Sequence, residues 1–204
     1  MIIFHLFYDL DMFKYVDIDF QKDAFWYWLP RLIVFLFMLS VGLSFSIAHK
    51  TRIKKAPYFK RLAKIGICAI GISISTYFLF PNNWVYFGTL HCIFFSTILI
   101  TPFRKSPYLS LVFFYVFIGL ELSGVQIPFF QMEHAAMDYI PIWPWIGYSF
   151  LGIFLAHHDF HKFKTPDVKA LQLIRFLGRH ALIIYLTHQP LMYGLIYLYT
   201  TVTN

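Results

Sequence analysis

The sequence predicts an all-α integral membrane protein, a bundle of about seven transmembrane helices. Hydrophobic residues make up 59% of the chain and charged residues only 13%, with a mean hydropathy of +0.62. Lipid can solvate that much apolar surface, whereas a soluble domain would struggle to bury it. A second observation is a run of seven Lys and Arg residues, with no acid, between Lys50 and Lys64. Apolar stretches near the roughly 20 residues that a helix needs to cross a bilayer flank this run.

The helices follow in order from the apolar stretches. The first is truncated, because only seven residues, Met1 to Phe7, precede Tyr8 and Asp9. Either the chain starts late, or this helix enters only the outer half of the bilayer. No signal peptide is expected, since the apolar start has neither a positive n-region nor a small-residue cleavage site. Longer helices are predicted at residues 24–48, 62–80, 84–101, 108–123, 142–156 and 179–199, within a single transmembrane domain of residues 1–204.

The distribution of charge predicts the orientation of these helices. Cytoplasmic loops carry an excess of Lys and Arg, so we expect the loop from His49 to Lys64 inside, the N-terminus in and the C-terminus out. All five Trp residues then fall at outer helix ends, where amphipathic rings prefer the headgroup level. The expected location is therefore a membrane that the chain crosses several times. Fourteen of the seventeen basic residues become cytoplasmic, including Arg104, Lys105, Lys162, Lys164, Lys169, Arg175 and Arg179.

Several classes of protein are disfavoured by the same features. A net charge of +7 is also typical of nucleic-acid-binding proteins, but the basic residues here sit in short loops beside apolar spans, where orientation and anionic lipid account for them. Cys68 and Cys92 lie in apolar helices, where a thiol is an ordinary packing residue. The sequence therefore indicates no disulfide or zinc framework, and we expect no metal ion.

Polar side chains within the spans are the candidates for function, because a charge near the bilayer centre costs about 2.5–3.5 kcal/mol. At a rise of 1.5 Å per residue, His5 lies about 6 Å and Arg31 about 10 Å below the outer boundary. His91 is about as deep as Arg31, and His188 is near the middle of the last helix. These four side chains could meet in the outer half of one bundle. The structural alternative is that each histidine joins two helices by a hydrogen bond and Arg31 extends to the headgroups.

His5, Tyr8 and Asp9 stand at i, i+3 and i+4, and therefore share one face of a regular helix. A carboxylate that accepts the proton of one ring nitrogen fixes the tautomer of a histidine. The other nitrogen is then free to take a proton from a hydroxyl or amine. The spacing suits an oriented general base, the alternative being that Asp9 belongs to the solvated outer loop.

Five segments together resemble a known family. The chain is similar to the bacterial DUF1624 proteins and to the heparan-α-glucosaminide N-acetyltransferase catalytic domain, over nearly its whole length. The resemblance implies a transmembrane acyltransferase that passes an acyl group from a cytoplasmic thioester donor to a glycan or similar acceptor at the opposite face. One departure is the lack of the Asp-x-x-Arg-Gly-type segment with which the family usually begins. The resemblance is carried by "MIIFHLFYDLDMF", "PRLIVFLFMLSVGLSFS", "VYFGTLHCIFFSTILI", "PWIGYSFLGIFLAH" and "LGRHALIIYLTHQPLMYG".

The resemblance also implies roles for individual residues. His5 occupies the "FHxxYD" position of the first helix and is the expected catalytic base, with Asp9 beside it. Arg31 matches an arginine at the start of the family's second helix. His91 matches the histidine of the "FGxLH" motif, and His188 matches that of the "YLxHQP" motif. Either Arg31 or His91 is expected to stabilise the oxyanion that forms during transfer. Acetyl-CoA is the expected donor. Its phosphates are expected at the cytoplasmic basic surface, on Arg52, Lys54, Lys55 and Arg61, whose charge plain membrane topology would also explain.

The sequence leaves several alternatives open. Direct transfer and a covalent acyl-histidine intermediate use the same residues. A small transporter with these side chains along its path is a second candidate function, and a membrane haem protein with His91 and His188 as axial ligands a third. Gly42, Ser44 and Ser46 could pack against a neighbouring helix within the chain or across a homodimer.

Overall fold

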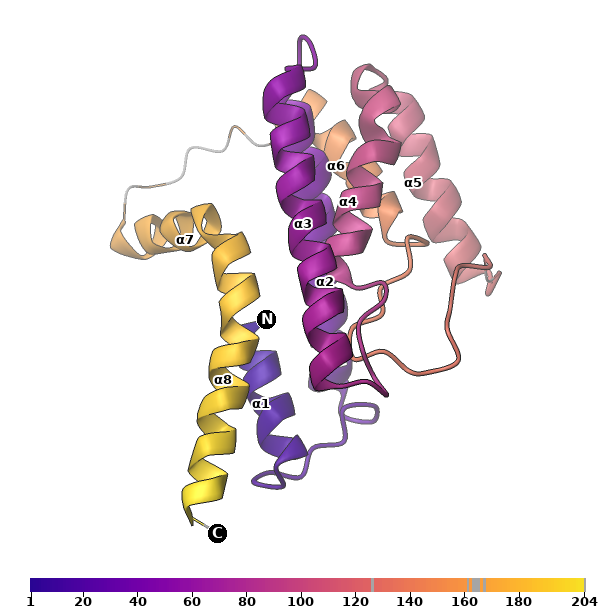
Figure 1. Cartoon of the computed structure of the whole chain (residues 1–204). Helices are drawn as coiled ribbons and strands as arrows, with labels where there is room; N and C mark the ends of the chain where they lie inside the picture. Colours follow the sequence, from indigo (N-terminus) through magenta and orange to yellow (C-terminus); the bar gives the residue numbers. More distant parts are fainter. Residues whose placement is uncertain (126, 161, 163–165, 167, 204) are drawn as a thin grey trace. The chain divides into compact units, whose positions relative to one another are not determined.

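The computed structural model describes residues 1–125, 127–160, 162, 166 and 168–203 (Figure 1). These residues form eight α-helices and one 3₁₀ helix, with no strand among them. The predicted all-α class is thus confirmed for the described part of the chain. Lys164, expected on the cytoplasmic side, lies outside it. The elements are α1 (Ile2–Met12), α2 (Ala24–Ala48), α3 (Lys55–Leu79), α4 (Thr89–Ile100), η1 (Thr101–Lys105), α5 (Pro107–Leu122), α6 (Ile146–His157), α7 (Lys169–Arg179) and α8 (Ala181–Thr203).

Three helices, α2, α3 and α8, are long and apolar enough to cross a membrane. Helices α5 and α6 are apolar but shorter, with 16 and 12 residues. At 1.5 Å per residue, a 12-residue helix covers about 18 Å of a hydrocarbon core about 30 Å thick. The chain is therefore a membrane protein with three helices of spanning length, while the expected count of seven stays a prediction.

Helix boundaries show where hydropathy and local structure diverge. Helix α2 has the predicted bounds, but α3 begins at Lys55, ahead of the predicted residue 62, because Lys and Arg are good helix formers although they are not apolar. Helices α4 and α6 begin at Thr89 and Ile146, later than predicted, since the apolar residues before them lie in irregular backbone. The segment before α8 forms a separate helix, α7, which the apolar pattern did not reveal.

One compact unit of the structure contains residues 1–33 and the described residues from 166 to 203. Within it, α1 and α8 lie side by side and run in the same direction (Figure 1). Three contacts fix this register: Gln189 bonds to Asp9, the Phe13 and Tyr193 rings lie 5.4 Å apart, and the Tyr15 and Thr200 hydroxyls lie 3.0 Å apart. His5 is thereby brought beside His188, a residue distant in the sequence.

The second unit, residues 34–162, contains the rest of α2 and the helices α3 to α6. Its fully buried core includes Met38, Phe45, Ile100 and Ile153. The loop from α2 to α3, the loop from α4 to α5 and the end of α6 all lie at one end of this unit (Figure 1). We call this the basic end, because these segments, the first two turns of α3 and the residues after α6 carry Lys50, Arg52, Lys54, Lys55, Arg61, Arg104, Lys105 and Lys162.

At the opposite end of the second unit, the α3–α4 and α5–α6 connections bond to each other. The Met137 amide donates to the Asn83 carbonyl at 3.0 Å, and the Ile140 amide donates to the Phe87 carbonyl at 3.1 Å. The His134 ring stacks on Trp84, with centroids 5.4 Å apart. Main-chain bonds between loops satisfy polar groups that would be costly to leave unpaired next to lipid.

Candidate functional site

The first candidate site joins α1 to α8 through two histidines. The ring centroids of His5 and His188 lie 5.0 Å apart, with the ring planes tilted by 59°. His5 is half-buried and His188 is buried, at 8% exposure. Two of the residues predicted for the site therefore lie next to each other.

The main chain of α8 fixes the tautomer of His188. Its Nδ1 lies 3.0 Å from the Ile184 carbonyl oxygen and 2.8 Å from that of Tyr185. Carbonyl oxygens only accept hydrogen bonds, so Nδ1 carries the proton and the neutral ring presents a lone pair at Nε2. That Nε2 atom is buried and has no hydrogen-bond partner among the described residues. A positioned imidazole with an open nitrogen can accept a proton from a reacting group.

Gln189, which the sequence analysis did not single out, holds Asp9 in place. Asp9 is fully buried, and its Oδ1 accepts a hydrogen bond of 2.8 Å from Gln189 Nε2. The other two oxygens of the pair, Asp9 Oδ2 and Gln189 Oε1, are buried and lack a partner within the described chain. The sequence feature that could have identified Gln189 as a site residue is its position directly after His188 in the "YLTHQP" segment. With His188 Nε2, three buried polar atoms of α1 and α8 thus lack a partner among the described residues, and each could bond to a polar group of a substrate.

Replacement of Gln189 by leucine is expected to destabilise the protein by about 1–3 kcal/mol, because the buried Asp9 carboxyl loses the one donor it has among the described residues. The measurement is the unfolding midpoint of the detergent-purified protein. The double variant D9L/Q189L should recover much of the loss, since removing both partners leaves no polar group unpaired. Equal midpoints for Q189L and the unmodified protein would contradict the importance of this bond.

His91, at the start of α4, has both ring nitrogens bonded. Its Nδ1 accepts from the Gly88 amide at 3.2 Å, so the proton is on Nε2, which donates to Ser73 Oγ at 3.2 Å. Ser73 in turn donates to the Val85 carbonyl at 2.7 Å. His91 thus caps the N-terminus of α4 and links this helix to Ser73 of α3. Because both ring nitrogens are hydrogen-bonded, neither is available to bind a haem iron.

Arg31 contacts its own helix. Its guanidinium donates to the Tyr27 carbonyl, and Cζ lies 3.5 Å from the centroid of the Tyr27 ring. This cation–π contact and hydrogen bond hold the charge within the first turns of α2. The expected part of Arg31 in oxyanion stabilisation stays a prediction.

The second candidate site is the basic end of the 34–162 unit. Arg52, Lys54 and Lys55 are exposed around the start of α3. Arg61 is partly buried and donates to Ser44 Oγ at 3.2 Å.

His49 and Arg104 extend this basic end inward. His49 is buried at 5% exposure, and its Nδ1 accepts from the Lys54 amide at 3.3 Å. The pKa of His49 lies below its usual value because burial removes water from the ring and because Arg61, Lys54 and Arg104 repel its proton. Arg104 Nε is buried without a partner in the described part of the chain. Sequence reasoning placed Arg104 on this side but did not predict that its Nε would be buried.

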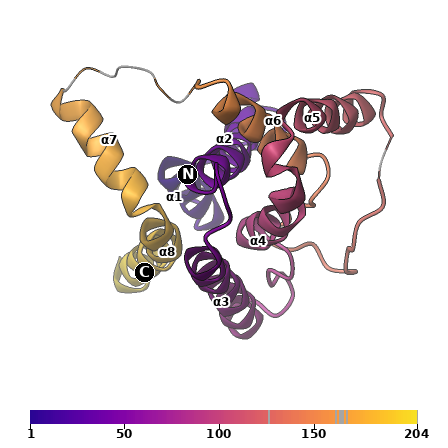
Figure 2. The same cartoon turned by 90° about the horizontal axis from the view of Figure 1, so that it is seen from above.

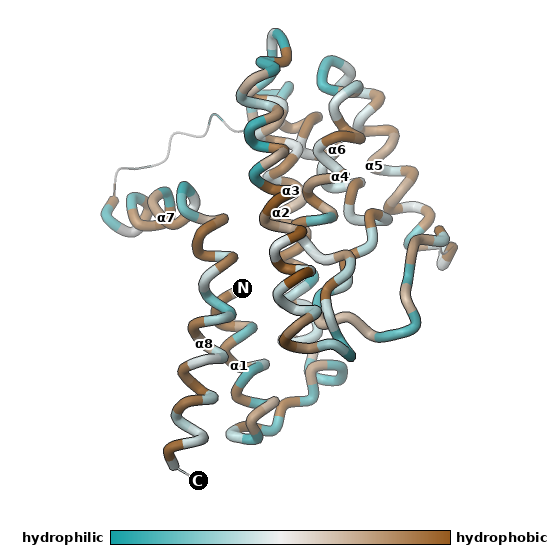
Figure 3. Tube along the Cα trace, viewed as in Figure 1, coloured by the Kyte–Doolittle hydropathy of each residue, from teal (hydrophilic) through white to brown (hydrophobic). Residues whose placement is uncertain are grey.

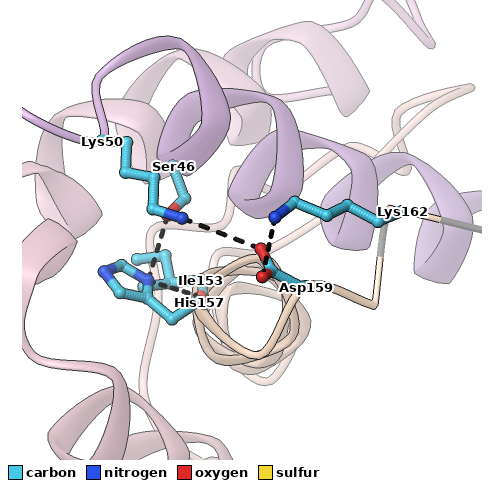
Figure 4. Close-up of polar contacts among 6 residues, drawn as sticks. All are labelled: Ser46, Lys50, Ile153, His157, Asp159 and Lys162. Carbon is cyan, nitrogen blue, oxygen red and sulfur yellow. Dashed lines mark hydrogen bonds and ion pairs between the residues drawn. The ribbon is translucent and has the colours of Figure 1, made fainter.

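An ion-pair cluster closes one side of the basic end (Figure 4). Asp159 pairs with Lys162 at 2.8 Å and with Lys50 at 3.7 Å, which links the α2–α3 loop to the end of α6. Nearby, Ser46 and His157 Nδ1 lie 3.3 Å apart. Since Lys50 and Lys162 already face a carboxylate, the residues better placed to attract an anion are those around His49 and Arg104. No group of three or more His, Cys, Asp or Glu that could hold a metal ion is found among the described residues.

The described chain thus combines apolar helices of spanning length, a pair of adjacent histidines and a cluster of cationic side chains. The chain matches, over residues 1–190, the family described as heparan-alpha-glucosaminide N-acetyltransferase, catalytic. It belongs to this family, which confirms the resemblance seen in the sequence and identifies the class as membrane acetyltransferase. No curated protein and no solved structure matches the chain.

Proposed function

We propose that the protein transfers an acyl group, most simply acetyl, from cytoplasmic acetyl-CoA to a hydroxyl or amine of a sugar or glycan at the outer face of a bacterial inner membrane. The observation that carries the proposal is the His5–His188 pair, in which one ring is locked by the main chain and keeps an open Nε2. The family match supplies the reaction class.

The proposed topology has seven transmembrane helices, with the N-terminus in and the C-terminus out. Its support is the clustering of basic loops at one end of the 34–162 unit, together with the parallel course of α1 and α8. The first and the seventh of seven alternating helices must run in the same direction. Cytoplasmic loops are rich in Lys and Arg, so the basic end is assigned to the cytoplasm.

The donor is proposed to bind at the basic end through its phosphates. Arg52, Lys54, Lys55 and Arg61 supply charge at the rim, and Arg104 supplies an inward donor without a protein partner in the described chain. Charge-assisted bonds from guanidinium to phosphate are short and strong, and Arg offers them in a bidentate fork.

In the proposed reaction, His5 takes the proton of the acceptor hydroxyl or amine as that atom attacks the thioester carbonyl. The tetrahedral oxyanion collapses, the C–S bond breaks, and the leaving thiolate takes up a proton to give free CoA. His188, beside His5, either assists this proton transfer or carries the acyl group in a covalent variant. Asp9 Oδ2 and Gln189 Oε1 can accept hydrogen bonds from a hydroxylated acceptor.

The test is a calorimetric titration of acetyl-CoA into the detergent-purified chain and into the R61Q/R104Q variant. A hydrogen bond to a charged group is worth about 1.5–3 kcal/mol, so loss of one such contact should weaken binding about 10- to 100-fold. Lys105→Gln is the control for charge alone, because Lys105 is exposed beside Arg104 and its replacement removes one positive charge, where R61Q/R104Q removes two. Equal affinity of R61Q/R104Q and K105Q would contradict a donor site at these arginines.

A further inference from the structure

Helix α7 separates its apolar and basic residues onto opposite faces. Its sequence is KALQLIRFLGR, without an acidic residue. At 3.6 residues per turn, Leu173, Ile174 and Leu177 share one face, whereas Arg175 and Arg179 lie on the other. Figure 3 shows hydrophilic and hydrophobic residues interspersed along the helix.

The apolar face of α7 is uncovered. Leu173 is 58% exposed, Ile174 61% and Leu177 44%, and Phe176 at the margin is 56% exposed. Burial of one such side chain stabilises by about 1.5–3 kcal/mol, so a face of this kind is costly to leave in water. A partner that binds this face must be apolar where it contacts Leu173, Ile174 and Leu177, and it must accommodate the positive charges of the neighbouring basic residues.

The junction between α7 and α8 determines the position of this apolar face relative to α8. His180 joins the two helices: its amide bonds to the Phe176 and Leu177 carbonyls, and its carbonyl accepts from the Ile184 amide. Helix α8 then continues as one of the three candidate spans. Helix α7 lies across the start of α8 (Figure 1), and the view from above shows it extending sideways from that point (Figure 2). A helix across the end of a membrane span would lie at the membrane–water interface.

We propose that α7 is an in-plane helix that binds the anionic phospholipid of the leaflet in which α8 begins. Leu173, Ile174 and Leu177 insert among the acyl chains, as in other interfacial amphipathic helices. Lys169, Arg175 and Arg179 lie within a Debye length of the lipid phosphates and are attracted to them. Apolar burial and charge together select a negatively charged leaflet over a zwitterionic one. This inference does not rest on the proposed acyl transfer.

The test uses the whole chain in lipid nanodiscs, with an environment-sensitive fluorophore on one introduced cysteine. Cys68→Ala supplies the background, and Cys92 stays because it is fully buried. Leu173→Cys reports the apolar face, and Gln172→Cys is the matched control one residue away on the basic face. Both replaced side chains are exposed, so the fold should tolerate the labels.

In phosphatidylcholine nanodiscs that contain phosphatidylglycerol, the probe at 173 should be quenched by nitroxide-bearing lipids while the probe at 172 stays accessible to water. The variant K169Q/R179Q should lower the ratio of docked to undocked helix about thirtyfold, and high salt should act in the same direction. Equal water access of the two probes would overturn the proposal. Equal docking in nanodiscs with and without phosphatidylglycerol would overturn the recognition of anionic lipid.

Discussion

His5→Ala is expected to lower the rate of acetyl transfer by about 10²- to 10⁴-fold, the usual contribution of a positioned general base. The alanine leaves acetyl-CoA affinity unchanged, because the donor phosphates are proposed to bind in the 34–162 unit. His188→Ala should have a comparable effect, since it removes the open Nε2 beside His5. The measurement is the initial rate with saturating acetyl-CoA and a panel of sugar acceptors, on protein whose unfolding midpoint is checked.

His158→Ala provides the matched control, because His158 is exposed directly after α6 and belongs to the 34–162 unit rather than to the α1–α8 pair. Single-turnover mass spectrometry distinguishes the two mechanisms left open by the sequence. An acetylated protein that disappears in only one of the two histidine variants would identify the residue that carries the acyl group. Full activity of His5→Ala would rule out His5 as the base.

Gly42→Ala is expected to destabilise the protein by about 3 kcal/mol or more, above the usual range for overpacking. A Cβ at Gly42 would lie 1.9 Å from the Ser149 carbonyl oxygen, and one at Gly152 would lie 2.4 Å from the Leu39 carbonyl oxygen. Both obstacles are main-chain atoms, so α2 and α6 would have to separate. Ser149 Oγ also donates to the Met38 carbonyl at 2.8 Å, a bond that the separation would break.

Gly71→Ala and Gly119→Ala are the matched controls, because both glycines are helical and a Cβ at either meets no atom within 4 Å. In these open positions alanine should stabilise by about 0.5–1 kcal/mol through its better helix propensity. The unfolding midpoints of all three variants are measured in detergent. Similar shifts for Gly42→Ala and Gly71→Ala would contradict close packing between α2 and α6.

The same geometry bears on the small residues of α2. Gly42 packs on α6 of its own chain, and Ser46 lies 3.3 Å from His157 Nδ1 of that helix. Close approach through small residues is a common way for membrane helices to associate, since lipid gives no hydrophobic drive between them. Gly42 and Ser46 thus serve contacts within the chain, and a homodimer, if one forms, would use another surface.

The sequence by itself determined the class of the protein and much of its helical layout. Long apolar stretches must satisfy every main-chain polar group internally, so they become helices, and 24–48 was predicted with the bounds that α2 has. The rare polar side chains in those stretches, His5 and His188 among them, were equally visible, because each is costly in lipid.

Only the tertiary structure decided which polar groups meet. Gln189 reaches Asp9 because α1 and α8 run parallel in one register, and His91 is bonded on both nitrogens because α3 places Ser73 beside it. Packing likewise buries Arg104 Nε, and α7 has an apolar face that hydropathy averaged along the chain does not show. Burial in lipid is a property of each local stretch and can be read residue by residue. A hydrogen bond or a ring contact depends on packing between segments far apart in the chain, which no local pattern encodes.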